Sequence, residues 1–487
     1  MTGARELIAQ VLDDGSFRSW DSAAQTPGAD PDYVAALARA GERSGADEAV
    51  LTGEGMVDGH RVAVVVGEFG FLGGSIGVAA AERIIAAFDR ATEQRIPVLA
   101  APISGGTRMQ EGTRAFVQMV SISTAVVRHR AAGLPYLVYL RNPTTGGVFA
   151  SWGSMGHVTV AEPGALIGFL GPKVYQALYG EPFPEGVQTA ENLYRHGLID
   201  AVIDARHLRS LVTTVLGILA PASMIPVSAP RPASAPGEID DWEIVMRSRA
   251  RGRPGLRTLL RRASASTIPL SGTGRGEFDP TLWLALASFA GRGAVVLGQD
   301  RRAQTRESAL GPGALRVASR GVRLAEDLGL PIVTVIDTPG AALSKEAEEG
   351  GLAGEIGRTM VALAGARVPV VSVLLGQGAG GGAIALLPAD RIIAAENSWL
   401  SPLPPEGASA IMHGTTDFAP AIARQQRIAS WHLFEDGIVD EVVPEPAEDA
   451  EALCDRVAAA IARAVGELAS ASIDDLTARR GMRFRVR

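Results

Sequence analysis

The residues of this chain whose types and spacing could do chemistry are mainly glycines. Four glycine-rich turns each follow an apolar run, and they read SGGTR (104–108), PTTGG (143–147), DTPGA (337–341) and GAGGGA (378–383). When a helix begins directly after such a turn, its first amides have no helical carbonyl to bind. Glycine lets a substrate approach those amides, which can stabilise negative charge developing on a carbonyl oxygen. The pattern predicts oxyanion holes built from backbone amides.

Side chains offer fewer candidates. The chain has two lysines, Lys173 and Lys345, among 46 basic residues. Neither lies in a phosphate-binding loop or follows a methionine, so we expect no Walker-type nucleotide site and no biotin or lipoate attached to this chain. The seven histidines lack metal-binding spacing, and the single Cys454 excludes an internal disulfide or a cysteine-cluster metal site. We therefore expect no metal and a cytoplasmic protein.

Two motifs allow other interpretations. Residues 73–77 fit the G-x-S-x-G pattern of a hydrolase nucleophile, which would make Ser75 catalytic; the alternative is a tight strand-to-helix turn. Residues 376–381 fit the dinucleotide fingerprint, with Glu396 in the position of its acidic residue. That fingerprint belongs in the first strand–helix turn of a nucleotide domain, whereas here it falls in a late one. We favour a structural turn in the first case and no nucleotide in the second.

Length and composition restrict the class of protein. A chain of 487 residues exceeds the roughly 250–300 residues of a single core, so two domains are expected. The net charge of -7 gives no support for nucleic-acid binding. One uncharged window, 368–389, reaches membrane length, but its glycines and a glutamine would interrupt a spanning helix. We expect no membrane segment, and the polar N-terminus lacks a signal-peptide core.

An internal repeat organises the chain. The pairs Pro97/Pro331, Pro135/Pro369 and Glu162/Glu396 lie in matching contexts and share one offset of 234 positions, the repeat offset; the glycine pairs of the turns match with a one-residue slip. In each copy, apolar runs alternate with alanine-rich helical stretches, which indicates a mostly parallel sheet covered on both faces. The sequence therefore predicts two α/β domains, at residues 1–218 and 239–487, joined by a Pro/Ala/Ser-rich linker at 219–238.

A basic run lies at the start of the second copy. Residues 247–262, RSRARGRPGLRTLLRR, contain seven arginines. A solvated helix face is the ordinary interpretation of such a run, and a patch that binds phosphate or a partner is the alternative.

Taken together, these motifs resemble the carboxyltransferases of biotin-dependent acyl-CoA carboxylases, members of the crotonase-like (ClpP/crotonase) superfamily. The first copy resembles the bacterial acetyl-CoA carboxylase β subunit in FLGGSIG, SGGTRMQEG, NPTTGGVFAS, EPGALIGFLGP, PEGVQTAENL and HGLID. The second copy resembles the α subunit in DWEIVMRSRARGRP, DTPGA, GQGAGGGAIAL and SPLPPEGASAI. The resemblance covers about residues 50–445 and implies two tandem crotonase-like domains, the first on the acyl-CoA side and the second on the biotin side.

The resemblance also implies a reaction and its residues. The family moves a carboxyl group from carboxybiotin to the α-carbon of an acyl-CoA through an enolate, and the cofactor supplies the base. The acceptor would be acetyl-CoA or another short acyl-CoA; acetyl-CoA would give malonyl-CoA for fatty acid biosynthesis. The implied catalytic amides are those of Gly146, Gly147, Gly382 and Ala383. The implied acyl-CoA contacts are Ser104, Gly105, Gly106, Arg108 and Thr145, and the implied biotin contacts are Pro339, Gly340, Ala341 and Gly381. For Arg108 the alternative is a structural ion pair.

Partners follow from the same resemblance. Separate biotin carboxylase and biotin carboxyl carrier proteins are implied, and family members place the active site between the first domain of one subunit and the second of its neighbour, which implies a homodimer or a larger oligomer. The chain departs from the family in lacking the β subunit's four-cysteine zinc ribbon and in reading DTPGAALS instead of DTPGAYPG. Three alternatives remain: a decarboxylase of a malonyl- or glutaconyl-type thioester, a serine hydrolase using Ser75, and an inactive scaffold subunit.

Overall fold

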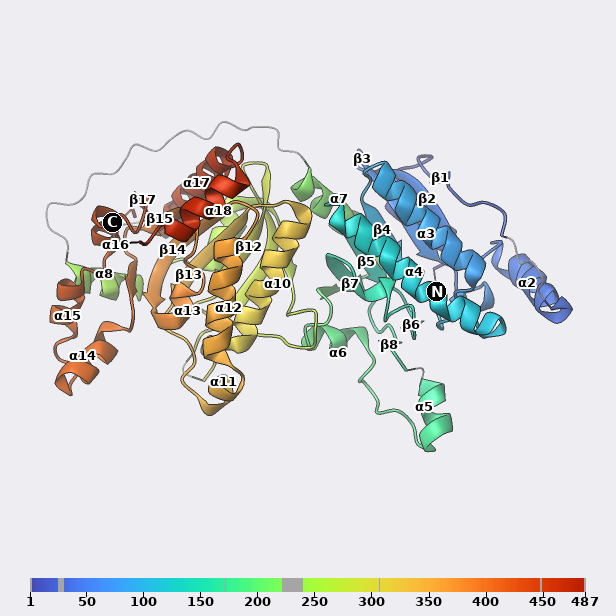
Figure 1. Ribbon diagram of the computed structural model, residues 1–487, viewed down its shortest axis with the longest axis horizontal. Helices are drawn as coiled ribbons and strands as arrows, with labels where there is room; N and C mark the ends of the chain where they lie inside the picture. The colour runs from blue at the N-terminus through green and yellow to red at the C-terminus, as the bar shows by residue number, and fades with distance from the viewer. Residues whose placement is uncertain are drawn as a thin grey trace. The chain divides into compact units, whose positions relative to one another are not determined.

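The computed structural model describes residues 2–24, 30–170, 172–220, 240–305, 307–446 and 449–485. The chain forms two compact units (Figure 1). Unit 1 comprises residues 1–217 with 274–276, and unit 2 comprises residues 218–273 with 277–487. All but the first two residues of the linker expected at 219–238 lie outside the described residues.

Unit 1 is built on a seven-stranded sheet of order β1-β2-β3-β4-β5-β7-β9. The pairs β1–β2 and β2–β3 are antiparallel, and every later pair is parallel. The central strands are continuous apolar runs such as VAVVVG and YLVYL, as expected for strands buried on both faces. The strands are β1 (Arg18–Ser19), β2 (Val50–Val57), β3 (His60–Gly67), β4 (Val98–Ala101), β5 (Tyr136–Leu140), β7 (Val158–Ala161) and β9 (Ala201–Val202); a small pair beside them joins β6 (Thr144–Thr145) to β8 (Ile167–Gly168).

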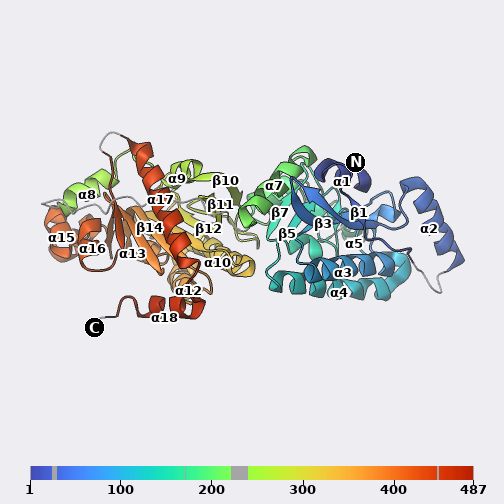
Figure 2. The same cartoon turned by 90° about the horizontal axis from the view of Figure 1, so that it is seen from above.

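Helices cover both faces of this sheet. Figure 2 shows α3 (Val78–Glu93) and α4 (Gly112–Ala131) on one side, and α1 (Ala4–Val11) and α7 (Leu208–Leu219) on the other. Helix α3 buries alanines together with Ile84 and Phe88 at three- and four-residue spacing, so one apolar stripe faces the strands. The remaining helices of the unit are α2 (Pro31–Ser44), α5 (Pro172–Tyr179) and α6 (Ala190–Arg195).

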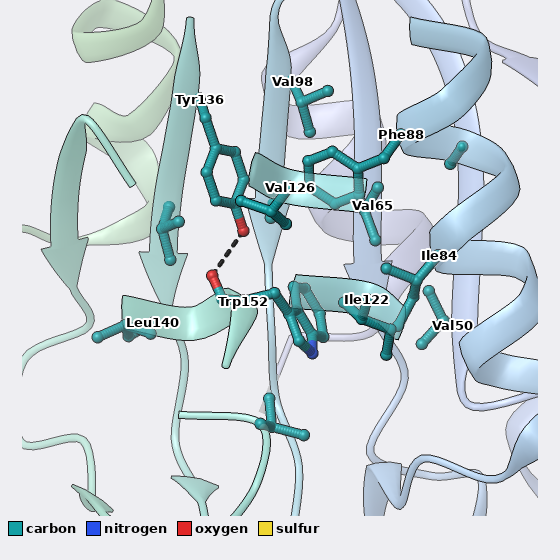
Figure 3. Close-up of a cluster of buried hydrophobic side chains, with 14 of the residues drawn as sticks. Val50, Val65, Ile84, Phe88, Val98, Ile122, Val126, Tyr136, Leu140 and Trp152 are labelled. Carbon is teal, nitrogen blue, oxygen red and sulfur yellow. Dashed lines mark hydrogen bonds between the residues drawn. The ribbon is translucent and has the colours of Figure 1, made fainter. Parts of the chain in front are cut away.

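The core beneath α3 and α4 reaches the segment that carries the second glycine turn. Phe88 packs edge-to-face against Tyr136, with ring centroids 5.2 Å apart. The Tyr136 hydroxyl donates a 2.6 Å hydrogen bond to the carbonyl of Trp152, which is itself buried (Figure 3). This bond fixes the chain a few residues after Gly147, so the turn rests on the rigid core of unit 1.

Unit 2 repeats this architecture. Its main sheet has the order β10-β11-β12-β13-β14-β15-β17, and β16 pairs with β14. Its strands are β10 (Ser264–Leu270), β11 (Leu282–Phe289), β12 (Arg292–Gln299), β13 (Ile332–Thr338), β14 (Val370–Ala379), β15 (Arg391–Ala395), β16 (Trp399–Ser401) and β17 (Glu441–Val443). As in unit 1, a hairpin is followed by parallel pairs, from β12 onward.

The helices of unit 2 also lie on two faces. Figure 2 shows α9 (Leu256–Ala263) and α17 (Ala450–Leu468) on one side of the sheet, opposite α10 (Pro312–Leu328) and α12 (Leu352–Gly365). The other helices are α8 (Asp241–Ser248), α11 (Lys345–Glu349), α13 (Gly380–Ile384), α14 (Pro405–His413), α15 (Ala419–Gln426), α16 (Ser430–Glu435) and α18 (Ile473–Met482). None of the helices in the described ranges is long and apolar enough to cross a membrane. The window 368–389 folds instead as β14 followed by α13.

The basic run fastens α8 and α9 to unit 2. Arg253 pairs with Glu445 and is largely buried, and Arg257 pairs with the buried carboxylate of Asp300 at 2.6 Å. Three further arginines of the run form ion pairs: Arg247 with Glu243, Arg249 with Glu406, and Arg262 with Glu451 and Asp455. Five of the seven arginines are therefore paired with carboxylates of the same unit, and only Arg253 among these five is buried.

Candidate active site

The first glycine turn follows β4 and is held by backbone contacts. The Ser104 hydroxyl accepts from the amide of Gly106 at 3.0 Å and lies 3.2 Å from that residue's carbonyl. The Gly105 amide donates to the carbonyl of Gly73 at 2.9 Å. Gly106 has φ +115°, a conformation that few other residues adopt. These contacts fix the turn without a charged side chain.

Arg108 lies inside the fold, at the end of this turn. Its side chain is fully buried, and its guanidinium pairs with Glu48 and donates to the carbonyl of Ser75 at 2.7 Å. Burial is the largest single influence and would lower the pKa of Arg108, but the hydrogen bonds and charge attraction from Glu48 and Tyr33 together outweigh it and the pKa is raised. Tyr33 also contacts the guanidinium, at 3.3 Å. The structure thus favours the structural ion pair over a contact with CoA.

The amide of Gly146 is not available to a ligand. It donates to the carbonyls of both Gly168 and Phe169 at 3.1 Å, and Gly146 has φ +62°. Gly146 therefore shapes the turn. The expectation that its amide is catalytic is wrong, because both hydrogen bonds of that amide go to carbonyls of the protein. The Thr145 hydroxyl donates to the carbonyl of Ser104 at 3.3 Å, so Thr145 and Ser104, both buried, join the two turns.

The next two amides are free. The carbonyl of Gly146 accepts from the amide of Ala150 at 3.1 Å, and that of Gly147 accepts from the Ser151 hydroxyl at 2.6 Å. A planar trans peptide points its N–H away from its C=O, so the amides of Gly147 and Val148 face the other way. Neither amide has a hydrogen-bond partner among the described residues.

Thr107 brings a third free amide beside them. A parallel bridge between Ile76 and Thr107 uses the amides of Ile76 and Arg108, which leaves the Thr107 amide unpaired within the described ranges. A Cβ placed on Gly147 would lie 3.4 Å from the Thr107 hydroxyl and 3.2 Å from Cγ of Met119. Two turns therefore present free amides side by side. We did not predict Thr107, although it is the repeat equivalent of Ala341.

Unit 2 repeats the first turn closely. The Thr338 hydroxyl accepts from the amide of Gly340 at 3.1 Å and lies 3.0 Å from its carbonyl. Gly340 has φ +140°, and a parallel bridge joins Leu310 to Ala341, each one repeat offset after its counterpart in unit 1. The amide of Ala341 has no partner in the part of the chain that the structure describes. Pro339 is exposed, whereas Gly340 and Ala341 are half-buried.

The second turn of unit 2 opens the short helix α13. Gly380 has φ +63°, which matches Gly146 at the repeat offset without the expected slip. The N-cap is Ala379, whose side chain makes no capping bond. In such a helix the amides of Gly381 and Gly382 have no helical partner, and Ala383 is the first residue whose amide does. A Cβ on Gly382 would lie 3.5 Å from the Ala341 amide nitrogen. The free pair is thus 381–382, one residue before the expected pair 382–383.

The rival motifs have structural explanations. The only side chain that donates to the Ser75 hydroxyl in the described ranges is Arg108, at 3.4 Å, and a guanidinium cannot act as the base of a nucleophilic serine. Gly376 and Gly378 lie inside β14 rather than in a turn, and a Cβ on either would clash with a neighbour, at 2.5 Å and 2.7 Å respectively. They are glycines for close packing, and no dinucleotide fingerprint is formed.

The sequence is similar to that of known proteins over nearly its whole length. Residues 2–469 match the carboxyl transferase domain family. The chain is 54% identical to a probable biotin-dependent acyl-coenzyme A carboxylase beta3 subunit of Mycobacterium tuberculosis over 99% of this chain and 97% of that protein. It is 38% identical to the acetyl-coenzyme A carboxylase carboxyl transferase subunits beta/alpha of Salinispora arenicola, over 91% of this chain and 82% of the relative.

Solved structures show the same fold at low identity. The transcarboxylase 12S, described as a hexamer with methylmalonyl-coenzyme A bound, superposes with a TM-score of 0.76 at 19% identity over 96% of this chain and 90% of its own. A single-chain, multi-domain long-chain acyl-CoA carboxylase gives 0.73 at 20% identity over 93% of this chain and 45% of its own. The predicted tandem α/β architecture is confirmed.

Proposed function

We propose that the two units of this chain, which belongs to the carboxyl transferase domain family and is a biotin-dependent acyl-CoA carboxylase carboxyltransferase, each supply one oxyanion hole. Each hole is built from backbone amides. In unit 1 the amides of Thr107, Gly147 and Val148 bind the thioester oxygen of the acyl-CoA. In unit 2 the amides of Ala341 and residues 381–382 bind the ureido oxygen of biotin.

One observation carries this proposal. Both units present unpaired amides from two adjacent turns at repeat-equivalent positions, and in both a glycine of the second turn lies beside the residue that carries the free amide of the first. A thioester enolate and a ureido oxygen each carry negative charge in the reaction, and fixed N–H dipoles stabilise such charge. The expected acceptor is acetyl-CoA or another short acyl-CoA, as the name of the Salinispora relative suggests.

The donor set of unit 2 fits biotin's ureido group. A neutral, planar ureido ring needs hydrogen-bond donors and close approach, and the turns supply amides beside glycines with no ionisable side chain at Gly382. When bound, carboxybiotin supplies the carboxyl group and the base for the α-proton. The residues of this chain hold the two oxygens and set the distance between the reacting carbons.

Partners are proposed on the same basis. The Mycobacterium relative is named as a subunit of a biotin-dependent carboxylase, and we expect a biotin carboxylase and a biotin carboxyl carrier protein to supply the cofactor. We also expect a homo-oligomer, because large apolar side chains are exposed at equivalent positions in the two units. Four such pairs are related by the repeat offset: Met109/Leu343, Val127/Val361, Phe169/Leu403 and Leu178/Met412.

The first pair lies directly after the site turns. Met109 is 84% and Leu343 98% exposed, which is costly for apolar side chains in water. Equivalent apolar faces on the two units would be covered together if unit 1 of one copy met unit 2 of another, which would also bring the two holes to one site. A second copy of this chain is therefore the proposed occupant of both faces.

The amide proposal is tested by adding a side chain. Gly147→Val and Gly382→Val should each lower the transfer rate from carboxylated carrier to acyl-CoA by on the order of a hundredfold or more, the cost of losing an oxyanion donor. Gly481→Val is the matched control, since nothing lies within 4 Å of its Cβ position. An unchanged transfer rate in both site variants would contradict the proposal.

A further inference from the structure

Gln299, the last residue of β12, lies between the two turns of unit 2. Its side chain is fully buried. The Nε2 group donates to the carbonyl of Gly382 at 2.7 Å, and Oε1 accepts from the amide of Asp337 at 3.0 Å. The two bonds fix the orientation of the side-chain amide, because exchanging its oxygen and nitrogen would break both.

These two bonds join the elements that carry the free amides. Asp337 is the first residue of the turn 337–341, which carries Ala341, and Gly382 lies in the first turn of α13. Helix α13 ends at Ile384, so the Gly382 carbonyl has no donor of its own helix, and Gln299 supplies one. The pairing of β13 with β14 is irregular between Ile336 and Thr338, which is where Oε1 takes the Asp337 amide.

Unit 1 handles the same position differently. The residue equivalent to Gln299 at the end of β3 is Gly67, and a Cβ there would lie 2.9 Å from the amide nitrogen of Ile103, the counterpart of Asp337. The counterpart of Gly382 at the repeat offset is Val148, whose carbonyl accepts from the backbone amide of Gly153 at 2.9 Å. The two units thus share a fold, but a buried glutamine holds this carbonyl in unit 2 and a backbone amide holds it in unit 1.

We propose that Gln299 is the positioning residue of the unit 2 hole: it fixes α13 against the turn 337–341, so that the amides of Ala341 and residues 381–382 converge on one ligand oxygen. The proposal rests on the proposed function of unit 2 and concerns the ureido side of the reaction. Gln299 does not itself touch the ligand. Misplacement of reacting groups by about 1 Å can cost on the order of a hundredfold in rate, so the loss of the two Gln299 hydrogen bonds should have a measurable effect.

The test compares two glutamines. Gln299→Met removes both bonds at similar volume. Gln304→Met is the comparison, because Gln304 also contacts the turn, through the Asp337 carbonyl at 3.1 Å and the Thr338 hydroxyl, but not α13. In the full-length protein, biocytin serves as the free biotin substrate, and KM and kcat are measured for biocytin and acyl-CoA. Biocytin affinity is measured separately by calorimetry, and amide exchange over 380–386 by mass spectrometry.

We expect Gln299→Met to weaken biocytin binding and raise its KM by on the order of tenfold or more, with faster exchange over 380–386 and an unchanged KM for acyl-CoA. The Gln304 variant should show a clearly smaller effect. If the Met variant fails to fold, Gln299→Glu replaces only the donor to Gly382 and gives the same comparison. Unchanged biocytin affinity in a folded Gln299 variant, while Gly382→Val abolishes transfer, overturns the positioning role alone. Full activity of Gly382→Val would overturn the proposed site and this role with it.

Discussion

Ser104 and Thr338 occupy equivalent places in the two copies of the repeat and make the same contacts: each hydroxyl accepts from the amide two residues later and approaches the carbonyl of that residue within 3.2 Å. In each unit the glycine at that position has a positive φ. The next residue, Thr107 or Ala341, then has an amide that nothing in the described residues occupies. The repeated turn thus presents one free N–H in each unit.

The two glycines of the unit 1 turn should respond differently to alanine. Gly146→Ala places a Cβ at φ +62°, which should lower the free energy of unfolding by about 1–2 kcal/mol. Gly147→Ala has no such strain, but its Cβ would press on Met119 and Thr107 beside the free amides. Urea unfolding and transfer kinetics should therefore separate them, with stability loss mainly in the first and kcat loss mainly in the second. The reverse pattern would contradict our assignment of the amides.

The Arg108–Glu48 pair should be structural. Removing one partner of a buried ion pair leaves an unpaired charge, so Arg108→Met should cost about 3–5 kcal/mol in the free energy of unfolding. Adding Glu48→Gln should recover part of that loss, because the charge left behind is removed. If Arg108→Met kept its stability and instead raised the KM for acyl-CoA, the ligand-binding alternative would be correct.

The exposed apolar pair should determine assembly. Met109→Glu and Leu343→Glu each place a charge in a face that we expect a second copy to cover, so each should shift the protein toward monomer in analytical ultracentrifugation. Because both side chains are exposed, thermal stability of the monomer should change little. Met482→Glu, at another exposed methionine, serves as the control. A wild-type chain that sediments as a monomer at micromolar concentration would contradict the proposal.

Stability should fall at mildly acidic pH in part through His129. Burial lowers the pKa of His129 from 6.5 to about 4, and its ring is in van der Waals contact with Phe88. Between these values the unfolded chain binds a proton that the folded chain does not. The free energy of unfolding is therefore unaffected by His129 above pH 6.5, and it falls as the pH is lowered from 6.5 to 4. Between pH 7 and pH 5 this fall amounts to about 2 kcal/mol. Urea unfolding of His129→Gln should show a correspondingly smaller pH dependence than the wild type.

Much of this protein could be predicted from its sequence. The internal repeat, the apolar runs and the glycine-rich turns predicted two α/β units, each with a mostly parallel sheet. The scarcity of lysine and the scattered histidines indicated backbone amides as the catalytic groups. These features are local or periodic, so the sequence displays them directly. The family resemblance added the reaction, which the relatives bear out.

Which amides are free was decided by the tertiary structure. The Gly146 amide is occupied by the carbonyls of Gly168 and Phe169, and the Thr107 amide is left open by a bridge to Ile76, contacts between segments that are not adjacent in the sequence. The structural role of Arg108 likewise depends on its ion pair with Glu48, which lies far from it along the chain. A backbone group's partner is set by whichever segment the fold brings opposite it, and residue type carries little information about that. Sequence therefore determined where the glycine turns lie, and only the packed structure decided which of their N–H groups remain for a substrate.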